Sequence, residues 1–248
     1  MADEGRRQRR LRSGATARPR RRRVTLGTVL IVTVALVAAG AWFVWLPSYR
    51  PGLQPGERYG VDVSAYQGRI DWPVVARDDI GFVYIKATEG ADFVDPEFAA
   101  NWAGAGEAGL AHGAYHFFSL CSSGVAQAHN FLQVVPNNKA ALAPAVDLEL
   151  AGNCRLRPRS GAVDAQLTAF LHLVQARTGH TVVIYLGDDW AHRYPLPAVL
   201  DNPLWQLRVL RPPSGSRWVI WQVDGHAHVD GIKGNVDLDV MRARSGSR

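Results

Sequence analysis

The sequence predicts a mixed α/β fold, in which one N-terminal transmembrane helix precedes a closed barrel of eight strands with helices reduced in its second half. Three observations support this prediction. The chain has 248 residues, of which 47% are hydrophobic, which is enough for one large domain. From Tyr59 onward, short β-rich runs alternate with helical patterns, as is typical of strands connected by helices. A long stretch without any charge precedes these runs.

The excess of positive charge lies at the N-terminus. Residues 1–24 contain ten arginines and two acidic residues, so this segment carries +8 and the rest of the chain −2 of the formal net charge of +6. Because the remainder is slightly acidic, we expect no nucleic-acid partner. Arginine far outnumbers lysine, which is typical of a GC-rich bacterial genome.

Residues 25–46 form the uncharged stretch, which as a helix would span roughly 30 Å of hydrocarbon. The stretch is longer than the apolar core of a signal peptide, and cleavage after Ala39 or Ala41 is the alternative. Its last residues suit an aromatic belt at a membrane surface: Trp42, Phe43, Trp45 and Leu46. The positive-inside rule places the arginine-rich tail in the cytoplasm and everything after residue 46 outside the cell.

The exported part is expected to begin with a stalk, residues 47–58, followed by one folded domain over residues 59–248. The predicted strands cover residues 59–64, 82–87, 111–118, 145–150, 181–186, 204–210, 218–223 and 236–240. The predicted helices cover residues 96–108, 123–134 and 163–177. The alternation predicts a parallel sheet, whose functional residues lie at the C-terminal ends of the strands.

The two cysteines, Cys121 and Cys154, fall in the exported part, where an oxidising compartment permits a disulfide. We expect them to pair and close a loop of about 33 residues, which stabilises by roughly 3–4 kcal/mol in the chain-entropy model. Because they follow the third and fourth strands, the disulfide is expected to shape the rim of the functional face. The cysteines and histidines lack metal-ligand spacing, so no metal site is predicted.

Three glycines, Gly104, Gly106 and Gly109, match the G-x-G-x-x-G pattern of dinucleotide-binding loops. That pattern should follow a strand and open a helix, whereas here it ends a predicted helix. We therefore expect no cofactor, and we interpret these glycines as serving helix termination or close packing.

Two acidic residues, Asp147 and Glu149, stand two apart within an apolar predicted strand. Strand geometry places both on one face, with Cβ atoms roughly 6–7 Å apart. In a barrel interior, burial and mutual repulsion would keep one acid protonated near neutral pH, which is the arrangement needed to break a glycosidic bond. A strand edge with two solvated acids is the alternative. Asp62 and Asp237 favour the interior, because the first and last strands are neighbours in a closed barrel.

Aromatic and polar side chains near the predicted strand ends are candidates for sugar binding. Sugar rings stack their flat apolar faces on aromatic side chains, and polar groups bond their hydroxyls. The candidates are Tyr66, Gln67, Lys86, Glu89, Tyr115, Phe117, Tyr185, Trp205, Trp221 and Gln222. Taken singly, each aromatic residue could belong to the core and each polar one to an ordinary rim. We interpret His116 as a structural histidine.

Seven short motifs stand in a defined order along the exported part. They are residues 59–64 with 66–67, 86–90, 113–118, 147–149, 184–185, 221–222 and 234–239. This ordered set resembles the glycoside hydrolase family 25 lysozymes, the Chalaropsis-type muramidases, over about residues 59–241. The resemblance implies a TIM-like (β/α)5(β)3 barrel that hydrolyses the β-1,4 bond from N-acetylmuramic acid to N-acetylglucosamine in peptidoglycan.

The same resemblance implies roles for four acidic residues. Glu149 matches the general acid, Asp147 its partner carboxylate, and Asp62 and Asp237 the surrounding acidic network. The family is thought to retain anomeric configuration, with either a carboxylate or the acetamido group of the substrate as the nucleophile. The spacing of the two acids does not decide between these nucleophiles.

Two regions depart from the family pattern. In the last motif Asp239 and Met241 replace an asparagine and a phenylalanine, which adds negative charge near the site. In the sixth strand, residues 204–208, the small and aromatic residues that the family often has after the tryptophan, here Trp205, are missing. The expected partner is the peptidoglycan glycan strand, and the protein is expected to be a monomer. The alternative is a membrane-anchored module that binds peptidoglycan without cutting it, against which the presence of both Asp147 and Glu149 argues.

Overall fold

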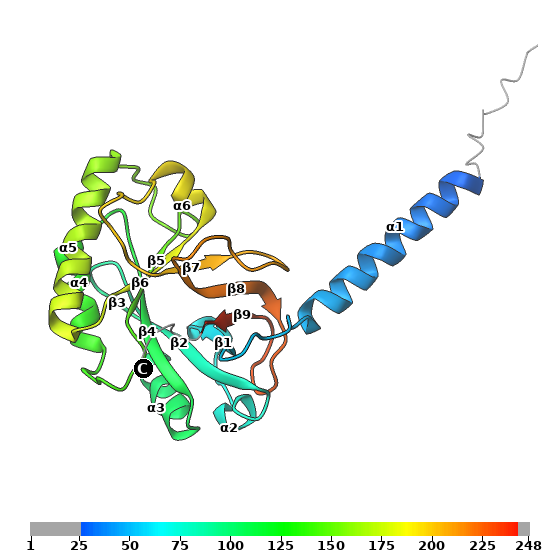
Figure 1. Cartoon of the computed structure of the whole chain (residues 1–248), viewed down its shortest axis with the longest axis horizontal. Coiled ribbons are helices and arrows are strands. Elements are labelled where there is room, and N and C mark those ends of the chain that lie inside the picture. Colours follow the sequence, from blue (N-terminus) through cyan, green and yellow to red (C-terminus); the bar gives the residue numbers. More distant parts are fainter. Residues whose placement is uncertain (1–25, 243–248) are drawn as a thin grey trace, which may run out of the picture. The chain divides into compact units, whose positions relative to one another are not determined.

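The computed structural model describes residues 26–242 of the chain (Figure 1). The chain divides into two compact units, Met1–Trp42 and Phe43–Arg248, and the predicted cytoplasmic tail of residues 1–24 lies outside the described residues. Helix α1 spans Leu26–Trp45 and exposes large hydrophobic side chains along its length. The segment Gly27–Ser48 is long and apolar enough to cross a membrane. The uncharged stretch of the sequence therefore forms one helix, and a proline-containing 3-10 turn, Leu46–Ser48, follows it.

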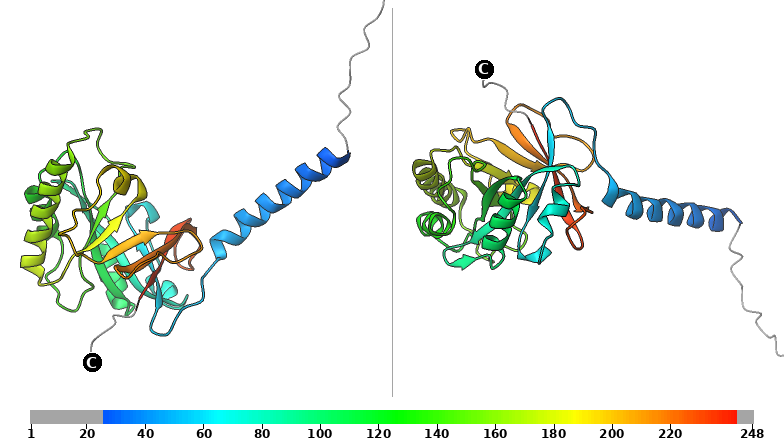
Figure 2. Two further views of the ribbon diagram at one scale, coloured as in Figure 1. Left: turned by 45° about the horizontal axis from the view of Figure 1, so that its top comes forward. Right: turned by 90° about the horizontal axis from the view of Figure 1, so that it is seen from below.

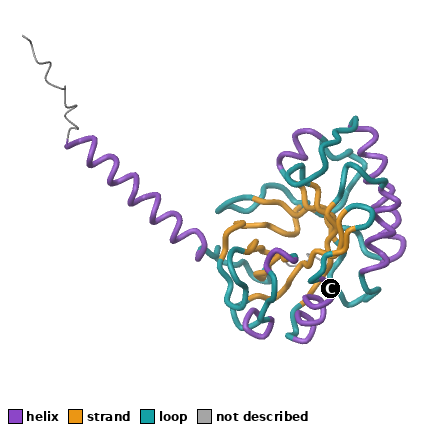
Figure 3. Tube along the Cα trace, turned by 180° about the vertical axis from the view of Figure 1, so that it is seen from behind, coloured by secondary structure: helices purple, strands orange, loops and turns teal. Residues whose placement is uncertain are grey.

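Eight strands close into a barrel, as the sequence predicts (Figure 3). Hydrogen bonds connect them in the order β1, β2, β4, β5, β6, β7, β8 and β9, and β1 pairs with both β2 and β9 to complete the ring. Their bounds are β1 Arg58–Val63, β2 Ile80–Glu89, β4 Ala111–Phe117, β5 Ala145–Leu148, β6 Val183–Leu186, β7 Leu204–Leu207, β8 Trp218–Ala227 and β9 Val236–Met241. An additional two-residue strand, β3 Phe93–Val94, pairs with the end of β2 outside the ring.

The helices of the barrel domain follow the first five barrel strands. They are α2 Trp72–Val75, α3 Phe98–Glu107, α4 Gly124–Val134, α5 Ser160–Thr178 and α6 Asp188–Arg193. Among the described residues, β7, β8 and β9 follow one another without an α-helix, which confirms the predicted reduction of helices in the second half. Helices α4 and α5 lie side by side on one flank of the barrel (Figures 1 and 2). Helices α2 and α6 were not predicted, because four and six residues are too short to show helical periodicity.

The prediction of an all-parallel sheet is wrong for β9. This strand runs antiparallel to both of its neighbours, β8 and β1, whereas the other barrel strands pair in parallel. Only residues 228–235 connect β8 to β9, and a parallel connection needs a crossover of about a dozen residues or more. The reversal brings the N-terminal end of β9 to the edge where the other strands have their C-terminal ends.

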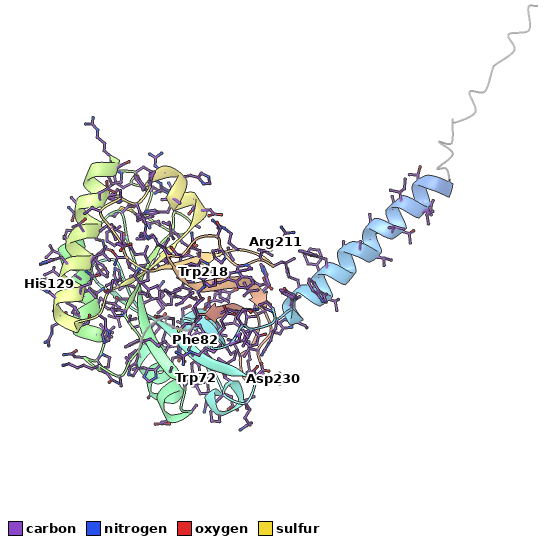
Figure 4. The ribbon with its side chains drawn as sticks, viewed as in Figure 1. Trp72, Phe82, His129, Arg211, Trp218 and Asp230 are labelled. Carbon is purple, nitrogen blue, oxygen red and sulfur yellow. A yellow bond between two sulfur atoms is a disulfide. The ribbon has the colours of Figure 1, made fainter. Side chains whose placement is uncertain are left out.

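Alternating side chains along the strands build two separate apolar layers. Outward-facing residues such as Val61, Ile85 and Val146 pack beneath the helices and belong to the larger layer. The smaller layer fills the inside of the barrel and contains large aromatic rings: Phe82, Tyr84, Tyr185 and Trp205, with Phe82 labelled in Figure 4. Because these rings fill much of the barrel interior, room for polar side chains remains mainly near the C-terminal ends of the parallel strands.

Two glycines make room for the interior rings. A Cβ on Gly60 would lie 2.3 Å from the Phe82 ring, and a Cβ on Gly113 would lie 2.9 Å from the Tyr84 ring. Gly104 has a similar role outside the barrel, where a Cβ would lie 2.3 Å from the ring of Trp72. The packing of Gly104 against Trp72 therefore fits the predicted role of the helical glycines in close packing.

The predicted disulfide between Cys121 and Cys154 is present, with Cα atoms 6.1 Å apart. It joins the loop after β4 to the loop after β5. Asn153, beside the second cysteine, donates from Nδ2 to the carbonyl oxygens of Phe118 (2.8 Å) and Glu149 (2.9 Å). The cross-link and this asparagine together fix the backbone directly after β5.

Candidate active site

A cavity of about 280 Å³ lies at the C-terminal end of the parallel strands. Every barrel strand except β2 contributes to its wall, either from the strand itself or from the residue next to it. The lining residues are Asp62, Tyr115, Asp147, Glu149, Tyr185, Trp205, Leu207, Gln222 and Asp237. The four predicted catalytic acids are therefore brought together in one cavity.

Asp147 and Glu149 face this cavity from the end of β5. The residue between them, Leu148, is fully buried in the layer beneath the helices, as strand alternation requires. Among the described residues, one oxygen of the Asp147 carboxyl, Oδ1, is buried without a hydrogen-bond partner. The two acids thus share one partly buried wall of the cavity, and Oδ1 of Asp147 can interact with a bound molecule.

Asp62 and Asp237 are direct cross-strand partners where β1 meets β9. Gln222 on β8 reaches both carboxyls: its Nε2 lies 3.5 Å from Asp62 Oδ2, and it also hydrogen-bonds Asp237. Asp239, two residues along β9, lies deeper in the barrel and is fully buried. The antiparallel direction of β9 explains this order, because its first acid reaches the cavity and its second lies towards the aromatic floor.

Burial raises the pKa of the Glu149 carboxyl to about 7, and the negative charges of Asp189 and Asp237 act in the same direction. A hydrogen bond with Tyr185 opposes this shift. Burial also raises the pKa of Asp237 to about 6, against a hydrogen bond with Gln222. A carboxyl with a pKa near 7 can exchange its proton near neutral pH, which is the property that a general acid needs.

Burial is also the main cause that raises the pKa values of Asp62, Asp147 and Asp239. For Asp147 the next cause is the charge of Glu149, while the ammonium of Lys86 lowers its pKa. Five carboxyls in one small space oppose one another's ionisation, and burial acts in the same direction.

Four of the predicted sugar-binding residues line the cavity: Tyr115, Tyr185, Trp205 and Gln222. The rings of Tyr185 and Trp205 meet edge to face, with centroids 5.3 Å apart. Burial raises the pKa values of the Tyr115 and Tyr185 hydroxyls, so both hydroxyls stay neutral and can donate hydrogen bonds.

Trp221 does not line the cavity, although we predicted it from the sequence to lie with Gln222 in the site. Its side chain belongs to the apolar layer beneath the helices, and its Nε1 donates to the carbonyl oxygen of Arg208 at 2.6 Å. The reason is strand alternation, because neighbouring residues on β8 point to opposite faces. Only Gln222 of this pair reaches the cavity.

Tyr66 and Gln67, two of the predicted sugar-binding residues, do not line the cavity. Tyr66 is 87% exposed on the 3-10 turn Ala65–Gln67 that follows β1. Gln67 closes that turn: its Oε1 accepts a hydrogen bond from the backbone N–H of Ser64 at 2.9 Å. Gln67 therefore organises the loop after β1.

The three candidates from β2 and β4 interact with one another beside the cavity. Lys86 forms an ion pair with Glu89 at 2.8 Å and lies over the Phe117 ring, with Nζ 5.1 Å from its centroid. His116, interpreted as structural, is buried between Thr88 Oγ1 (2.7 Å) and Gln127 Oε1 (3.0 Å).

Two residues near the site were not predicted from the sequence. Leu207 lines the cavity from the end of β7. Asp189 lies in α6, whose six residues gave no periodic pattern, and its Oδ2 accepts the backbone N–H groups of Leu150 and Ala151, both at 3.1 Å. Within residues 26–242, no group of three histidine, cysteine or acidic side chains is arranged to hold a metal ion.

The sequence profile of Glycosyl hydrolases family 25 matches residues 61–232. The chain is 37% identical over 191 residues to the protein YegX of Escherichia coli O6:H1, covering 74% of this chain and 69% of YegX. It is 33% identical over 192 residues to Lysozyme M1 of Streptomyces globisporus, covering 72% and 65%. A solved family 25 glycosyl hydrolase from Bacillus anthracis superposes with a TM-score of 0.70 at 31% identity, covering 80% of this chain and 94% of that one.

Proposed function

Because the chain belongs to Glycosyl hydrolases family 25, and is thus a glycoside hydrolase as predicted, we propose that it is a muramidase of peptidoglycan. The bond to be cut is the β-1,4 bond between N-acetylmuramic acid and N-acetylglucosamine. The observation that carries this proposal is the pair of acids at the end of β5, which face one cavity with the pKa of Glu149 raised to about 7. The relative named Lysozyme M1 supports the substrate class.

In the proposed mechanism Glu149 is the general acid. It donates its proton to the glycosidic oxygen as the bond to the anomeric carbon breaks, and a carboxyl with a pKa near 7 has the proton available at neutral pH. Hydrogen bonds from Asn153 to its carbonyl and from the next two amides to Asp189 hold this part of the chain in place. The proton donor is thereby oriented by the backbone that carries it.

Asp147 is the proposed partner carboxylate. The charge of Glu149 is the second cause that raises the pKa of Asp147, and this cause disappears whenever Glu149 is protonated. Lys86 then favours the ionised form of Asp147. In the proposed working state a neutral Glu149 lies beside an ionised Asp147, which orients and polarises the acetamido group of the substrate. The acetamido oxygen attacks the anomeric carbon as the protonated leaving sugar departs. A water molecule that gives its proton to Glu149 then opens the resulting ring, so that the configuration is retained overall. Direct attack by a carboxylate is the alternative.

The sugar is proposed to bind against the neutral part of the cavity wall. Tyr115, Tyr185 and Trp205 contribute aromatic surface to this wall, and Gln222 contributes an amide beside two carboxyls. Aromatic rings bind the apolar faces of sugars, while the amide and phenol groups can bond the hydroxyls.

We also propose that α1 anchors the enzyme in the membrane of a bacterium, with the N-terminus in the cytoplasm and the barrel outside. The length and apolar composition of Gly27–Ser48 support an anchor, and the ten arginines before it support this orientation. A cleaved signal peptide would have the same apolar character. The mass of the N-terminal peptide of the exported protein distinguishes the two.

The proposed activity is tested by incubating the purified full chain, in detergent, with cell-wall peptidoglycan and analysing the released muropeptides by mass spectrometry. We expect fragments with new reducing ends on N-acetylmuramic acid, and none with the Glu149→Gln variant. Reducing ends on N-acetylglucosamine would contradict the proposed bond. Binding to the walls without any release would identify a binding module instead.

A further inference from the structure

Residues 47–57, the part of the predicted stalk that precedes β1, lie against the barrel. We call this segment the connector. A free stalk should make few contacts with the domain that it carries. Here the carbonyl oxygen of Pro47 accepts a hydrogen bond from the backbone N–H of His228 at 2.8 Å, directly after β8. Pro51 is buried, and its carbonyl oxygen accepts from the Tyr59 hydroxyl on β1. The connector is thus bonded to the barrel at two separate points.

An ion pair fastens the middle of the connector. The guanidinium of Arg50 contacts Asp78 through two nitrogens: Nη2 lies 2.6 Å from Oδ2, and Nη1 donates to the carbonyl oxygen at 2.7 Å. The two side chains are only 24% and 25% exposed. Asp78 Oδ2 also accepts the backbone N–H of Asp230 at 2.9 Å, in the same loop as His228. Because this pair is largely shielded from water and has two hydrogen bonds, it should hold more firmly than an exposed ion pair.

Apolar side chains of the connector add to the packing of the barrel. Tyr49 and Leu53 pack against the apolar layer beneath the helices. The 3-10 turn Leu46–Ser48 contacts β8, which among the described residues has no α-helix after it. The connector thus contributes to the cover of the half of the barrel that is poor in helices.

The outer end of α1 lies close to these contacts. Its last residues, Phe43, Val44 and Trp45, are 76%, 77% and 47% exposed and belong to the same compact unit as the barrel. Only Leu46 separates Trp45 from Pro47, so at most roughly 7 Å of chain lies between the helix and the first bond to the barrel. A free linker with the 11 residues of the connector would instead have an r.m.s. span of roughly 17–20 Å.

The aromatic residues at this point fit the surface of a lipid bilayer. The rings of Trp45 and Tyr49 meet with centroids 4.7 Å apart, and Tyr49 also packs against the barrel. Tryptophan and tyrosine are enriched at membrane–water interfaces, where an apolar ring and a polar group are both accommodated. This ring pair therefore joins the end of the helix to the barrel at the level expected for the lipid headgroups.

We propose that the connector is a fixed support, which holds the flank of the barrel around His228 at the outer surface of the lipid bilayer. This inference rests on the proposed function, because it needs α1 to remain in the membrane as an anchor. His228 lies six residues beyond Gln222 of the cavity wall, which is roughly 20 Å at 3.3 Å per strand residue. The cavity is thus kept within roughly 30 Å of the outer end of α1. The glycan strands within its reach are those nearest the membrane.

The first test concerns the connector alone and uses the full chain in detergent. Replacing residues 47–57 by the same number of glycines and serines would not affect the barrel if this segment were a free stalk. A docked connector instead contributes buried side chains and an ion pair. We therefore expect the replacement to lower the melting temperature by at least about 5 °C. An equal melting temperature for the two chains would overturn the proposal.

A single substitution gives the same answer should the replaced chain fail to fold. Arg50→Gln keeps a polar side chain and removes the ion pair with Asp78. The backbone N–H of His228 should then exchange with deuterium at least about tenfold faster, because its acceptor on Pro47 is released more often. Arg177→Gln is the matched control, which removes an exposed charge in α5 and should leave this exchange rate unchanged. Equally fast exchange in the native and Arg50→Gln chains would contradict the docking.

The second test concerns the membrane. Neutron reflectivity of the full chain in a supported bilayer of phosphatidylethanolamine and phosphatidylglycerol measures the water layer between the lipid headgroups and the protein. We expect no such layer for the native chain. A layer of roughly 17–21 Å should appear when about 12 glycines and serines are inserted between Leu46 and Pro47, since this lengthens the tether and keeps the connector. Water layers of equal thickness in the two chains would show that the native barrel is not held at the bilayer.

The two tests separate this inference from the proposed function. If the exported protein has lost its N-terminal segment, the proposed anchor fails and the membrane part of the inference fails with it, while the measurements in detergent still decide whether the connector is docked. If the native chain does not cut peptidoglycan, the muramidase proposal fails, and neither the melting temperatures nor the reflectivity is affected.

Discussion

Asp189 and Glu149 approach the same point beside the backbone of Gly187. The position that a Cβ on Gly187 would take lies 3.0 Å from Asp189 Oδ1 and 3.2 Å from Glu149 Cγ. Asp189 also accepts the backbone N–H groups of the two residues that follow Glu149. Its carboxylate is thus tied to the segment that carries the proposed proton donor, and its charge is the second cause, after burial, that raises the pKa of Glu149.

Asp189→Asn should therefore lower the pKa of Glu149. We expect kcat/KM of the native enzyme to decline above about pH 7, as Glu149 loses the proton that it must donate. The variant should decline at a lower pH, by less than one unit, because solvent screens the exposed charge of Asp189. The asparagine oxygen still accepts the backbone N–H groups, so the fold should persist.

The matched control is Asp201→Asn, which removes one negative charge at a position that is 96% exposed and does not affect the pKa of Glu149. Its pH profile should match that of the native enzyme. An alkaline limb that stays in place, or moves up, in Asp189→Asn would contradict the assigned effect of this charge.

Asp147→Asn should bind the sugar and lose turnover. The amide is nearly the same size as the carboxyl, but it cannot supply the negative charge that the proposed mechanism requires beside the acetamido group. We expect kcat to fall by at least about a hundredfold while KM changes little, since the lost interaction is needed mainly in the transition state. Turnover of soluble glycan fragments and calorimetric binding of the same fragments measure the two effects. Near-normal turnover would refute the role of Asp147.

The acidic cavity was predictable because it depends only on two regular features. Strand alternation fixes Asp147 and Glu149 on one face, and closure of the barrel brings Asp62 next to Asp237. The same alternation rule could have excluded Trp221, since it cannot share a face with its neighbour Gln222. The short connection before β9 likewise could have predicted an antiparallel last strand.

Other parts of the site depend on contacts that leave no pattern in the sequence. Gln67 bonds the backbone of its own turn, and Lys86 pairs with Glu89 three residues on, so neither reaches the cavity wall. Asp189 acts through backbone amides of residues 150 and 151, about 40 positions earlier in the chain. Only the three-dimensional structure brings these groups together.

Removal of the disulfide should affect stability first. The Cys121→Ser, Cys154→Ser double variant loses the constraint on a loop with a sequence separation of 33, which contributes roughly 3–4 kcal/mol in the chain-entropy model. For a domain of this size that corresponds to a melting temperature lower by about 6–16 °C. Activity well below the melting transition should also fall, because the freed loop contains Asn153, which holds the carbonyl of Glu149. A double variant that melts at the same temperature as the oxidised native chain would contradict the structural role of the disulfide.

Gly187→Ala tests how closely the proton donor is confined. The backbone at this residue has a φ of −63°, which alanine adopts freely, so the effect must come from the added methyl group. That methyl would lie 3.0 Å from Asp189 Oδ1, 3.1 Å from the Leu148 carbonyl oxygen and 3.2 Å from Glu149 Cγ. Because the backbone oxygen cannot move easily, the two side chains must shift.

We expect kcat of Gly187→Ala to fall about tenfold or more, since a displacement of the proton donor by a fraction of an ångström weakens proton transfer. The melting temperature should change by only a few degrees. Gly161→Ala is the matched control, because a Cβ at that position in α5 meets nothing within 4 Å, and alanine there should stabilise the helix by about 0.5–1 kcal/mol without changing kcat. If both variants kept native turnover, Glu149 would have more freedom than its contacts with Gly187 and Asp189 imply.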